Sequence, residues 1–565
     1  MFSIRKIGVL GRTYRHLNRY QRILRVLFKY GFGDLVETLK IEQYLEIGLQ
    51  LISRKRREQL EKLTRAERVR MAMEELGPTF VKLGQLLSTR PDLIPFEYVQ
   101  ELSKLQDHVP PFSYDEVSTI VESEMGKPLE DVFLRFEKVP LAAASIGQVH
   151  RAQLKDNEDV VVKVQRPGIR RTIEVDLEIM FHLASLMERH LEEVELHRPT
   201  KIVEEFADSL EREMNYTTEA SNIETFARQF MEDETIYVPK VYRDLTTQRI
   251  LTMEYIEGIK TSDVDSLRKA GYDLEEITRR GADLMMKQIF VNGFFHADPH
   301  PGNLFILPNN VVCYLDFGMM GRISRQERED FSELVMQLAQ KDEKKVMHAL
   351  LKLSDYDAEP DRSRLERDLA EFVEHYLYRP LKELKVAGLL QRLIEILTRH
   401  GLRLKPGLFL MMKALSAVEG VARTLDADFE LITYAAPFVR DVYLKRLSPQ
   451  RIAGDMIDSG AEFLSLLREI PGELRAILKQ AREGKVKIEV EHSGLEPMLF
   501  THDRSSNRIA FAIVLAALII GSSLIGLSDI PPKWHEIPII GLAGFVVAGI
   551  MGFWLLISIL RRGRM

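Results

Sequence analysis

The order of a few polar positions constrains the fold of this 565-residue chain more than any other feature. An apolar run ends in Lys163, and far downstream Asp298 and Asn303 lie five residues apart. Asp316, thirteen residues after Asn303, begins an Asp-Phe-Gly sequence. Each sign alone is weak, because apolar strands that end in lysine and Asp-Phe-Gly turns are both common. Found together in this order, they indicate one shared site.

This set of side chains suits phosphoryl transfer. The reaction needs a carboxylate to orient the attacking hydroxyl or water, and oxygen ligands for the metal ions that bridge the phosphates. Asp298 is therefore the predicted catalytic carboxylate, and Asn303 and Asp316 are the predicted Mg²⁺ ligands. Lys163 could reach the α and β phosphates of ATP, held in place by an ion pair with Glu219.

The same stretch allows a metal cage as a second interpretation. His296, Asp298 and His300 offer three ligands within five residues. No second cluster of histidine, cysteine or aspartate in the sequence supplies the remaining ligands of such a site, so this interpretation is less favoured. The histidines then have a structural role, and we expect His296 to hydrogen-bond the backbone near Asp316.

The pattern of elements agrees with a two-lobed fold. Short β-rich runs recur between residues 132 and 253, interrupted by one long helical stretch from about Thr200 to Met231. After Gly258 the chain is mostly helical, apart from a hairpin over Leu304–Leu307 and Val311–Leu315. We therefore expect an α+β, protein-kinase-like bilobal fold with an N-terminal helical extension and a C-terminal transmembrane helical hairpin.

The N-terminal region is strongly basic, although the net charge of the whole chain is −6. Eight arginines and lysines precede Asp34, the first acidic residue. Such an arm can lie on an anionic membrane or pack as a solvated helix on its own domain, and no recognition motif favours nucleic acid. The expected domains are a basic N-terminal helical region (residues 1–70), a helical extension (71–115), a strand-rich N-lobe (116–256), a helical C-lobe (257–500) and two transmembrane helices (505–562).

Two apolar runs near the C-terminus predict a transmembrane hairpin. Residues 509–527 and 537–560 contain no charged side chain, and about 20 such residues cross the hydrocarbon core as a helix. Arginines flank the outer ends of both runs, so the positive-inside rule places these ends and the large soluble part in the cytoplasm. Gly544, Ala548 and Gly552 form a small-residue face for the first run or for a second copy in a homodimer.

Cys313 is the only cysteine of the chain, so no intramolecular disulfide can form. A reducing compartment is the expected setting. Because Cys313 lies within the apolar run Val311–Leu315, we expect a buried thiol with a structural role.

The loop that should cover the phosphates departs from the kinase pattern. Where a kinase has a glycine-rich loop, this chain has Pro140–Gln148, which contains three successive alanines. The Cβ of alanine disfavours positive φ and a very close approach of the backbone to phosphate, both of which glycine allows. The loop therefore predicts a modified ATP cradle.

Three motifs carry a family resemblance. They are Gly77–Arg90, with its central Lys82-Leu-Gly-Gln85, the loop Ala142–His150, and the stretch His296–Asn303. Together they resemble the UbiB family, atypical kinase-like proteins of coenzyme Q biosynthesis. The resemblance runs from about Tyr30 to Asp428 and extends to the C-terminal membrane hairpin of bacterial members. It implies a multi-pass protein of the bacterial cytoplasmic membrane.

Carried over by position, the resemblance assigns the Lys-x-Gly-Gln motif to Lys82 and Gln85. The family's Glu-x-Asp motif begins at Glu213 and ends here in Asn215, which removes one negative charge. Glu213 and Glu219 are six residues apart, so on a continuous helix their side chains would point about 120° away from each other. Glu213 could then pair with Lys82 while Glu219 pairs with Lys163. The predicted nucleotide-binding set comprises Lys82, Gln85, Ala142, Ala143, Ala144, Ser145, Lys163 and Glu213.

The resemblance implies a membrane-anchored atypical kinase or ATPase that uses Mg-ATP to support isoprenoid quinone biosynthesis, with the Lys-x-Gly-Gln segment blocking peptides. Its partners would be membrane lipids, quinone intermediates and quinone-biosynthesis enzymes, and not nucleic acid. Two alternatives stay open. One is a small-molecule or lipid phosphotransferase, because the loop around Asp298 resembles that of aminoglycoside and choline phosphotransferases. The other is a nucleotide-gated, non-catalytic scaffold.

Overall fold

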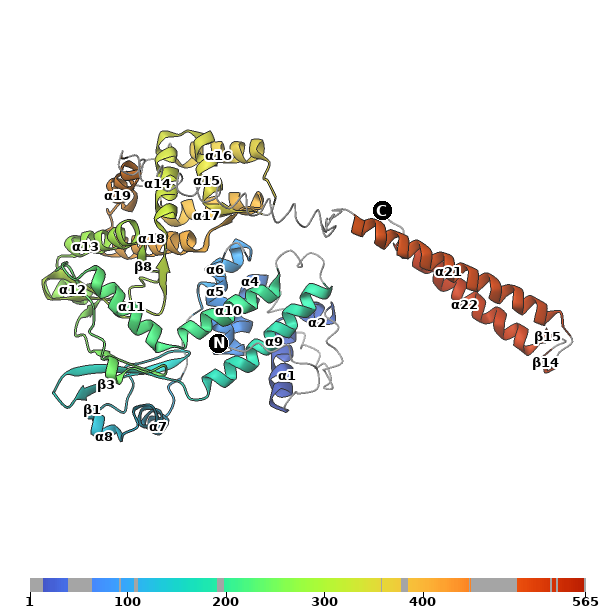
Figure 1. Cartoon of the computed structure of the whole chain (residues 1–565), viewed down its shortest axis with the longest axis horizontal. Coiled ribbons are helices and arrows are strands. Elements are labelled where there is room, and N and C mark those ends of the chain that lie inside the picture. The colour runs from blue at the N-terminus through green and yellow to red at the C-terminus, as the bar shows by residue number, and fades with distance from the viewer. Residues whose placement is uncertain are drawn as a thin grey trace, which may run out of the picture. The chain divides into compact units, whose positions relative to one another are not determined.

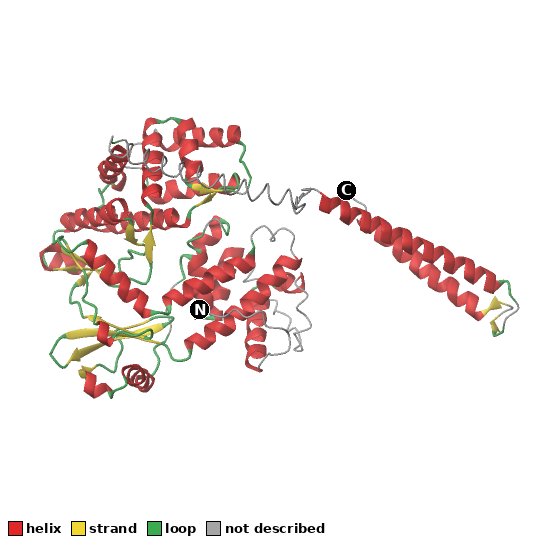
Figure 2. Cartoon of the chain, viewed as in Figure 1, coloured by secondary structure: helices red, strands yellow, loops and turns green. Residues whose placement is uncertain are grey.

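The chain falls into two compact units, Met1–Asp455 and Met456–Met565. The computed structural model describes residues 14–38, 63–90, 93–105, 110–190, 198–356, 358–377, 385–446, 448, 495–528, 531–534 and 537–562. One expectation lies partly outside these residues: the first part of the basic arm, residues 1–13. In the larger unit, strands gather in the N-lobe and helices fill the C-lobe (Figure 2), so the α+β bilobal prediction is confirmed.

The N-lobe is built on a five-stranded antiparallel sheet in the order β1-β3-β4-β6, with β2 paired to β3. Alternate residues of a strand point to the same face of the sheet, and Val160, Val162 and Val164 of β4 belong to one buried cluster with Val117 and Val121 of α7. The elements are α7 (Tyr114–Met125), α8 (Leu129–Val132), β1 (Phe133–Phe136), β2 (Ala142–Ala143), β3 (Gly147–Leu154), β4 (Asp159–Gln165) and β6 (Ile250–Glu254).

Three helices between β4 and β6 differ from the single long helix that we expected. They are α9 (Ile169–His190), α10 (Pro199–Glu213) and α11 (Tyr216–Gln229). The break has a local cause: the side-chain oxygen of Asn215 accepts from the Thr217 amide at 3.1 Å and caps α11. Asparagine competes with a continuing helix in this way. The expectation of one continuous helix through Glu213 and Glu219 is therefore wrong.

The N-terminal extension packs on its own domain. Arg19 donates to the buried carboxylate of Asp176 at 2.6 Å and to the Leu76 carbonyl at 2.8 Å, while Ile23 and Leu24 join the main core. Of the two interpretations of the basic arm, packing on its own domain is correct for the helix that contains Arg19, Ile23 and Leu24. The extension consists of α1 (Tyr14–Lys29), α2 (Gly33–Thr38), α4 (Arg65–Leu76), α5 (Pro78–Leu87) and α6 (Phe96–Leu102).

The C-lobe contains the predicted hairpin. Strands β9 and β10 pair antiparallel within a four-stranded sheet, which confirms the predicted hairpin. Cys313 of β10 is fully buried, which confirms the predicted burial of this thiol. The remaining short elements of the larger unit are β5 (Ile236–Tyr237), η3 (Arg243–Leu245), β7 (Ile259–Lys260), β8 (Phe294–His296), β9 (Leu304–Leu307), η5 (Pro308–Asn310), β10 (Val311–Tyr314), β11 (Met320–Arg322), β12 (Ser354–Asp355) and β13 (Arg403–Leu404). The helices are α12 (Val264–Lys269), α13 (Leu274–Met286) with its π-helical continuation η4 (Lys287–Asn292), α14 (Arg325–Gln340), α15 (Glu343–Lys352), α16 (Arg362–Leu377), α17 (Val386–Arg399), α18 (Pro406–Leu425) and α19 (Leu431–Arg446).

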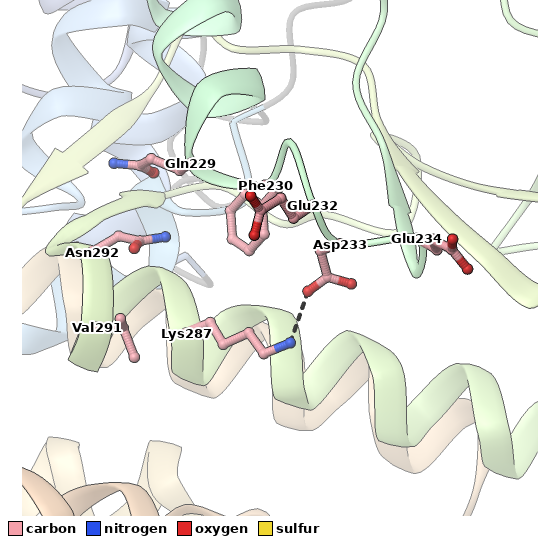
Figure 3. A pocket seen from close by; sticks show the side chains of 8 residues that line it. All are labelled: Gln229, Phe230, Glu232, Asp233, Glu234, Lys287, Val291 and Asn292. Atoms are coloured by element: carbon pink, nitrogen blue, oxygen red, sulfur yellow. Dashed lines mark hydrogen bonds and ion pairs between the residues drawn. The ribbon is translucent and has the colours of Figure 1, made fainter.

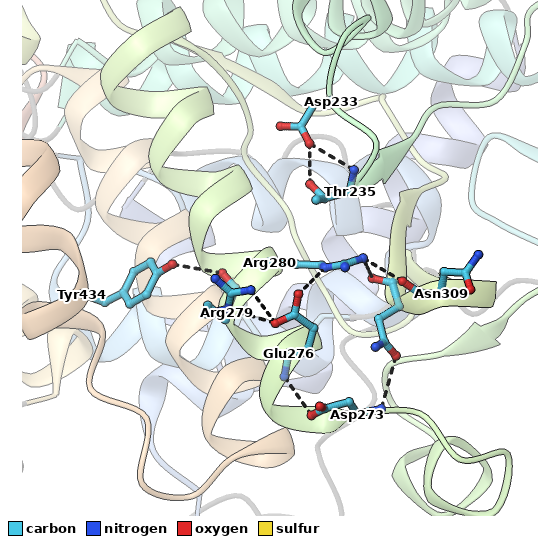
Figure 4. A network of polar contacts seen from close by, with 9 residues as sticks. Asp233, Thr235, Asp273, Glu276, Arg279, Arg280, Asn309 and Tyr434 are labelled. Carbon is cyan, nitrogen blue, oxygen red and sulfur yellow. Dashed lines mark hydrogen bonds and ion pairs between the residues drawn. The ribbon is translucent and has the colours of Figure 1, made fainter.

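The tip of the β9–β10 hairpin is tied to α13 (Figure 4). Asn309 and Asn310 adopt positive φ angles of 64° and 58°, which asparagine tolerates better than most residues. Arg280 donates to both of their carbonyls, at 2.7 and 3.0 Å, and Glu276 holds Arg280 at 2.7 Å. This network fixes the hairpin whose two outer ends carry Asn303 and Asp316.

The smaller unit is a helical hairpin. Helices α21 (Leu495–Gly526) and α22 (Ile539–Arg562) lie side by side and are joined through the paired strands β14 (Lys533–Trp534) and β15 (Ile537–Pro538) (Figure 1). A Cβ added to Gly544 would meet Ser522, one added to Gly552 would lie 3.6 Å from Leu515, and Ala548 is buried. The predicted small-residue face therefore contacts α21.

One segment of this unit has the length and apolar composition to cross a membrane. It is Ile509–Gly526 of α21. The apolar part of α22 within the described side chains, Ile539–Phe553, is shorter. Among the residues whose side chains are described, the smaller unit therefore contains one segment that meets both criteria for a membrane span.

Candidate active site

Lys163 and Glu219 form the centre of the site. Lys163 projects from the central strand β4, and its Nζ lies 2.9 Å from each carboxylate oxygen of Glu219 on α11. Burial alone would lower the pKa of Lys163, but Asp316 and Glu219 outweigh it and raise the pKa above its ordinary value. Lys163 is therefore held as a charged ammonium group in one orientation.

Asp316 lies beside this pair. Its Oδ2 is 4.0 Å from the Lys163 Nζ, and its Oδ1 accepts a hydrogen bond from the Gly318 amide at 2.9 Å. The nearby Lys163 is the main reason why the pKa of Asp316 is lowered. With half of its side chain exposed, the ionised carboxylate is open to a ligand.

His296 joins the two aspartate segments, and its predicted bond to the backbone near Asp316 is confirmed. Its Nε2 donates to the carbonyl oxygen of Asp316, and its Nδ1 accepts from the Asp298 amide at 3.3 Å. Burial lowers the pKa of His296, which favours the neutral ring that both bonds require. The amide of His296 in turn donates to Gln288 at 3.0 Å. The predicted structural role of this histidine is confirmed.

Asn303 connects the loop of Asp298 to the end of β10. Its side-chain nitrogen is 3.5 Å from the Asp298 carbonyl, and its own carbonyl accepts from Leu315 at 3.1 Å. The amide oxygen of Asn303 and the carboxylate of Asp316 are hard oxygen donors, which suit Mg²⁺. Among the described residues, no group of three histidine, cysteine, aspartate or glutamate side chains could hold a metal unaided. Water or phosphate oxygens would complete such a site.

The Lys-x-Gly-Gln helix α5 reaches the same region. Lys82 forms an ion pair with Glu213 at the end of α10, and the charge of Lys82 contributes to the lowered pKa of Asp316, after that of Lys163. The structure therefore gathers Lys82, Glu213 and Asp316. Gln85 also donates to the carbonyl of Leu105 at 3.2 Å, within the helical extension.

The alanine-rich loop forms a short turn against α11. Ala142 and Ala143 pair with β3, and the Ala144 amide donates to the Gly147 carbonyl at 2.8 Å. Ser145 is fully buried, and its Oγ has no hydrogen-bond partner in the part of the chain that is described. At Gly147 the missing side chain leaves room for Tyr216.

Two residues near the site escaped prediction from the sequence. Tyr216 is fully buried, and the Lys163 Nζ lies 5.3 Å from the centre of its ring. Lys413 of α18 is half-buried, and its pKa is lowered by burial against an opposing effect of Asp298. The sequence does single out Lys413, because it is the one charged residue in the apolar stretch between Gly407 and Val418.

A pocket of about 580 Å³ lies away from these residues, at the C-terminal end of α11 (Figure 3). Lys287 and Asp233 form an ion pair of 2.7 Å at its wall. None of the predicted site residues lines it. The lining residues are Gln229, Phe230, Glu232, Asp233, Glu234, Lys287, Val291 and Asn292.

A bilobal fold with an ion-paired strand lysine, two aspartates and an asparagine at the lobe junction defines a kinase-like protein. Three family models match the chain: the ABC1 atypical kinase-like domain over residues 104–350, the UbiB helical domain over 369–430 and the ABC1/UbiB kinase-like C-terminal domain over 493–561. The chain belongs to the ABC1/UbiB family. The predicted family and kinase-like fold are thus confirmed.

Relatives match along most of the chain. An uncharacterized protein encoded in the hydrogenase 1 5′ region of Clostridium pasteurianum is 34% identical over 96% of this chain and 99% of its own length. A probable protein kinase UbiB of Xanthomonas campestris is 33% identical, with the same coverage of both chains. A solved Mycobacterium tuberculosis structure with bound erythromycin is 24% identical, has a TM-score of 0.45, and covers 66% of this chain and 94% of its own.

Proposed function

We propose that the protein is a membrane-anchored atypical kinase or ATPase that uses Mg-ATP to support isoprenoid quinone biosynthesis. One observation carries the nucleotide part of this proposal. The ion pair between Lys163 and Glu219, both oxygens at 2.9 Å, stands 4.0 Å from the half-exposed Asp316. A fixed cation beside an open, ionised carboxylate suits a nucleotide phosphate with its metal ion.

Each side chain would have a separate task. Lys163 would bind the α and β phosphates, while Asn303 and Asp316 would hold Mg²⁺, which neutralises charge on the phosphates during transfer. Asp298 would orient the attacking water or hydroxyl and accept its proton. The new bond then forms at the γ phosphorus, the bond to the bridging oxygen breaks, and ADP leaves.

The acceptor is proposed to be water or a lipid-embedded molecule. The Lys82–Glu213 ion pair ties α5 to α10 beside Asp316, and this segment would stand in the way of a peptide. Quinone biosynthesis and a lipid setting enter from membership in the UbiB family. We further propose that α21 and α22 both cross the bacterial cytoplasmic membrane, with the kinase-like unit on the cytoplasmic side, because α22 is helical over 24 residues up to Arg562.

Hydrolysis by the purified full-length protein in lipid tests the enzymatic part. The Asp316→Asn variant should lose Mg-dependent ATP hydrolysis while retaining its fold. Equal activity of this variant and the wild type would refute the proposal.

Two further experiments test the assignment to quinone biosynthesis and the requirement for catalysis. Mass spectrometry of quinones and their precursors in a deletion strain should show depleted quinone, and an unchanged pool would remove the pathway assignment. An Asp298→Asn, Asp316→Asn double variant should fail to complement this strain. Full complementation would favour the scaffold alternative.

A further inference from the structure

Helix α18, from the helical region after the kinase core, lies against the strand that leads to the catalytic loop. A Cβ on Gly407 would come within 2.7 Å of the Arg322 carbonyl, so the start of α18 sits on β11. Strand β11 pairs with β8, with Met320 opposite His296. Figure 1 shows α18 beside β8. The helix is therefore anchored next to the segment that ends in Asp298.

The packing continues along the helix toward Lys413. Phe409 and Met412 of α18 belong to the same buried cluster as Phe295 and Ala297. Ala297 is the residue before Asp298, and Lys413 follows Met412. The ammonium group of Lys413 and the carboxylate of Asp298 interact electrostatically, and this interaction opposes the effect of burial on the pKa of the lysine.

Three lysines interact electrostatically with the two aspartates of the site. They differ in whether a glutamate pairs with the lysine. Lys163 is neutralised by Glu219, and Lys82 is neutralised by Glu213. Lys413 makes no hydrogen bond or ion pair with any residue that the structure describes. A half-buried ammonium group that no carboxylate pairs directly is costly unless another anion binds it.

We propose that Lys413 binds the terminal phosphate of the nucleotide, opposite the end that Lys163 binds. This inference rests on the proposed function. The γ-phosphoryl group has to lie near Asp298, because that carboxylate orients its attacker. Cations aimed at the equatorial oxygens stabilise the charge of phosphoryl transfer. Lys413 would distinguish ATP from ADP, since only ATP carries the phosphate that it reaches.

Binding measurements on the full-length protein in lipid test this assignment. Dissociation constants for Mg-ATP and Mg-ADP are compared between the wild type, Lys413→Met, Lys413→Arg and the control Lys405→Met, which removes the same charge about two turns earlier at the start of α18. Lys413→Met should weaken ATP binding about tenfold or more and ADP binding less than about twofold. Lys413→Arg should recover most of the ATP affinity, and Lys405→Met should match the wild type.

The outcomes separate this inference from the proposed function. A wild type that binds neither nucleotide removes both. A wild type that binds both, with equal losses of ATP and ADP affinity in Lys413→Met or with no loss at all, removes only the role of Lys413. Should Lys413→Met not fold, Lys413→Gln replaces it under the same criteria. As a second readout, kcat for hydrolysis should fall about a hundredfold in Lys413→Met.

Discussion

The Nζ of Lys163 lies 2.9 Å from both carboxylate oxygens of Glu219, and both side chains are largely buried. Removing one member of such a pair leaves the other charge without compensation. Glu219→Gln should therefore lower the free energy of unfolding by about 3 kcal/mol. Denaturant unfolding of the full-length protein measures this change.

A second pair on the same helix provides the control. Glu224 of α11 meets Arg243 at 2.6 Å, but both side chains are more than one third exposed. Glu224→Gln should cost less than about 1 kcal/mol. Equal losses for Glu219→Gln and Glu224→Gln would contradict the buried ion pair as the centre of the site.

Gly147 should not tolerate a side chain. A Cβ at this position would overlap the Tyr216 hydroxyl and lie 2.6 Å from the Val164 carbonyl. Gly147→Ala should lower the unfolding free energy by about 2 kcal/mol. Tyr216→Phe in the same chain should restore part of it, because the hydroxyl is removed while the carbonyl stays.

The control for this substitution is Gly281 of α13, where an added Cβ meets nothing within 4 Å. Gly281→Ala should raise stability by about 0.5–1 kcal/mol, because alanine favours a helix. A neutral Gly147→Ala would show that the alanine-rich loop is not held against Tyr216.

The residue at position 215 should cap α11 equally well as asparagine or as aspartate. Its side-chain oxygen accepts from the amide and hydroxyl of Thr217, at 3.1 and 2.7 Å. Asn215→Ala should cost about 1 kcal/mol of unfolding free energy. Asn215→Asp restores the residue type of the family motif and should stay within about 0.5 kcal/mol of the wild type, since aspartate caps as well. If the alanine variant is as stable as the wild type, the capping role is wrong.

His296 should make the fold sensitive to acid. Burial lowers the pKa of His296 below its ordinary value of 6.5, so the unfolded chain takes up this proton at a higher pH than the folded chain. The stability from neutral His296 is complete above about pH 6.5 and is lost as the pH falls toward the folded-state pKa. Below pH 6.5, the unfolding free energy of His296→Gln should therefore change less with pH than that of the wild type, by up to about 1.4 kcal/mol per pH unit. Parallel curves would contradict this.

Much of the fold was predictable because its signals are local. The β-branched runs gave β4 and β6, and the turn at Pro308–Asn310 gave the β9–β10 hairpin. Asp298, Asn303 and Asp316 could be grouped because short loops and one hairpin connect them. The bond of His296 to the backbone near Asp316 was also predicted, because no second ligand cluster favoured a metal site at this histidine.

The remaining features depend on contacts between distant segments. The break at Asn215 comes from a single side-chain cap within an otherwise helical pattern, and helix propensity is too weak to show it. The charges of Lys413 and Asp298 interact because α18 packs on β11, and no spacing in the sequence shows that these two residues come near each other. The sequence likewise could not decide whether the Gly544 face contacts α21 or a second copy of the chain; the packing of α22 on α21 shows the contact with α21.

The central claim is that Lys163, Glu219 and Asp316 form a site for Mg-ATP. The most direct measurement is the dissociation constant of ATP for the full-length protein in lipid, with Mg²⁺ and with a chelator in its place, for the wild type and Asp316→Asn. Mg²⁺ should tighten ATP binding by about tenfold or more in the wild type and should have little effect in Asp316→Asn. A wild type whose affinity for ATP is the same with and without Mg²⁺ would contradict the account.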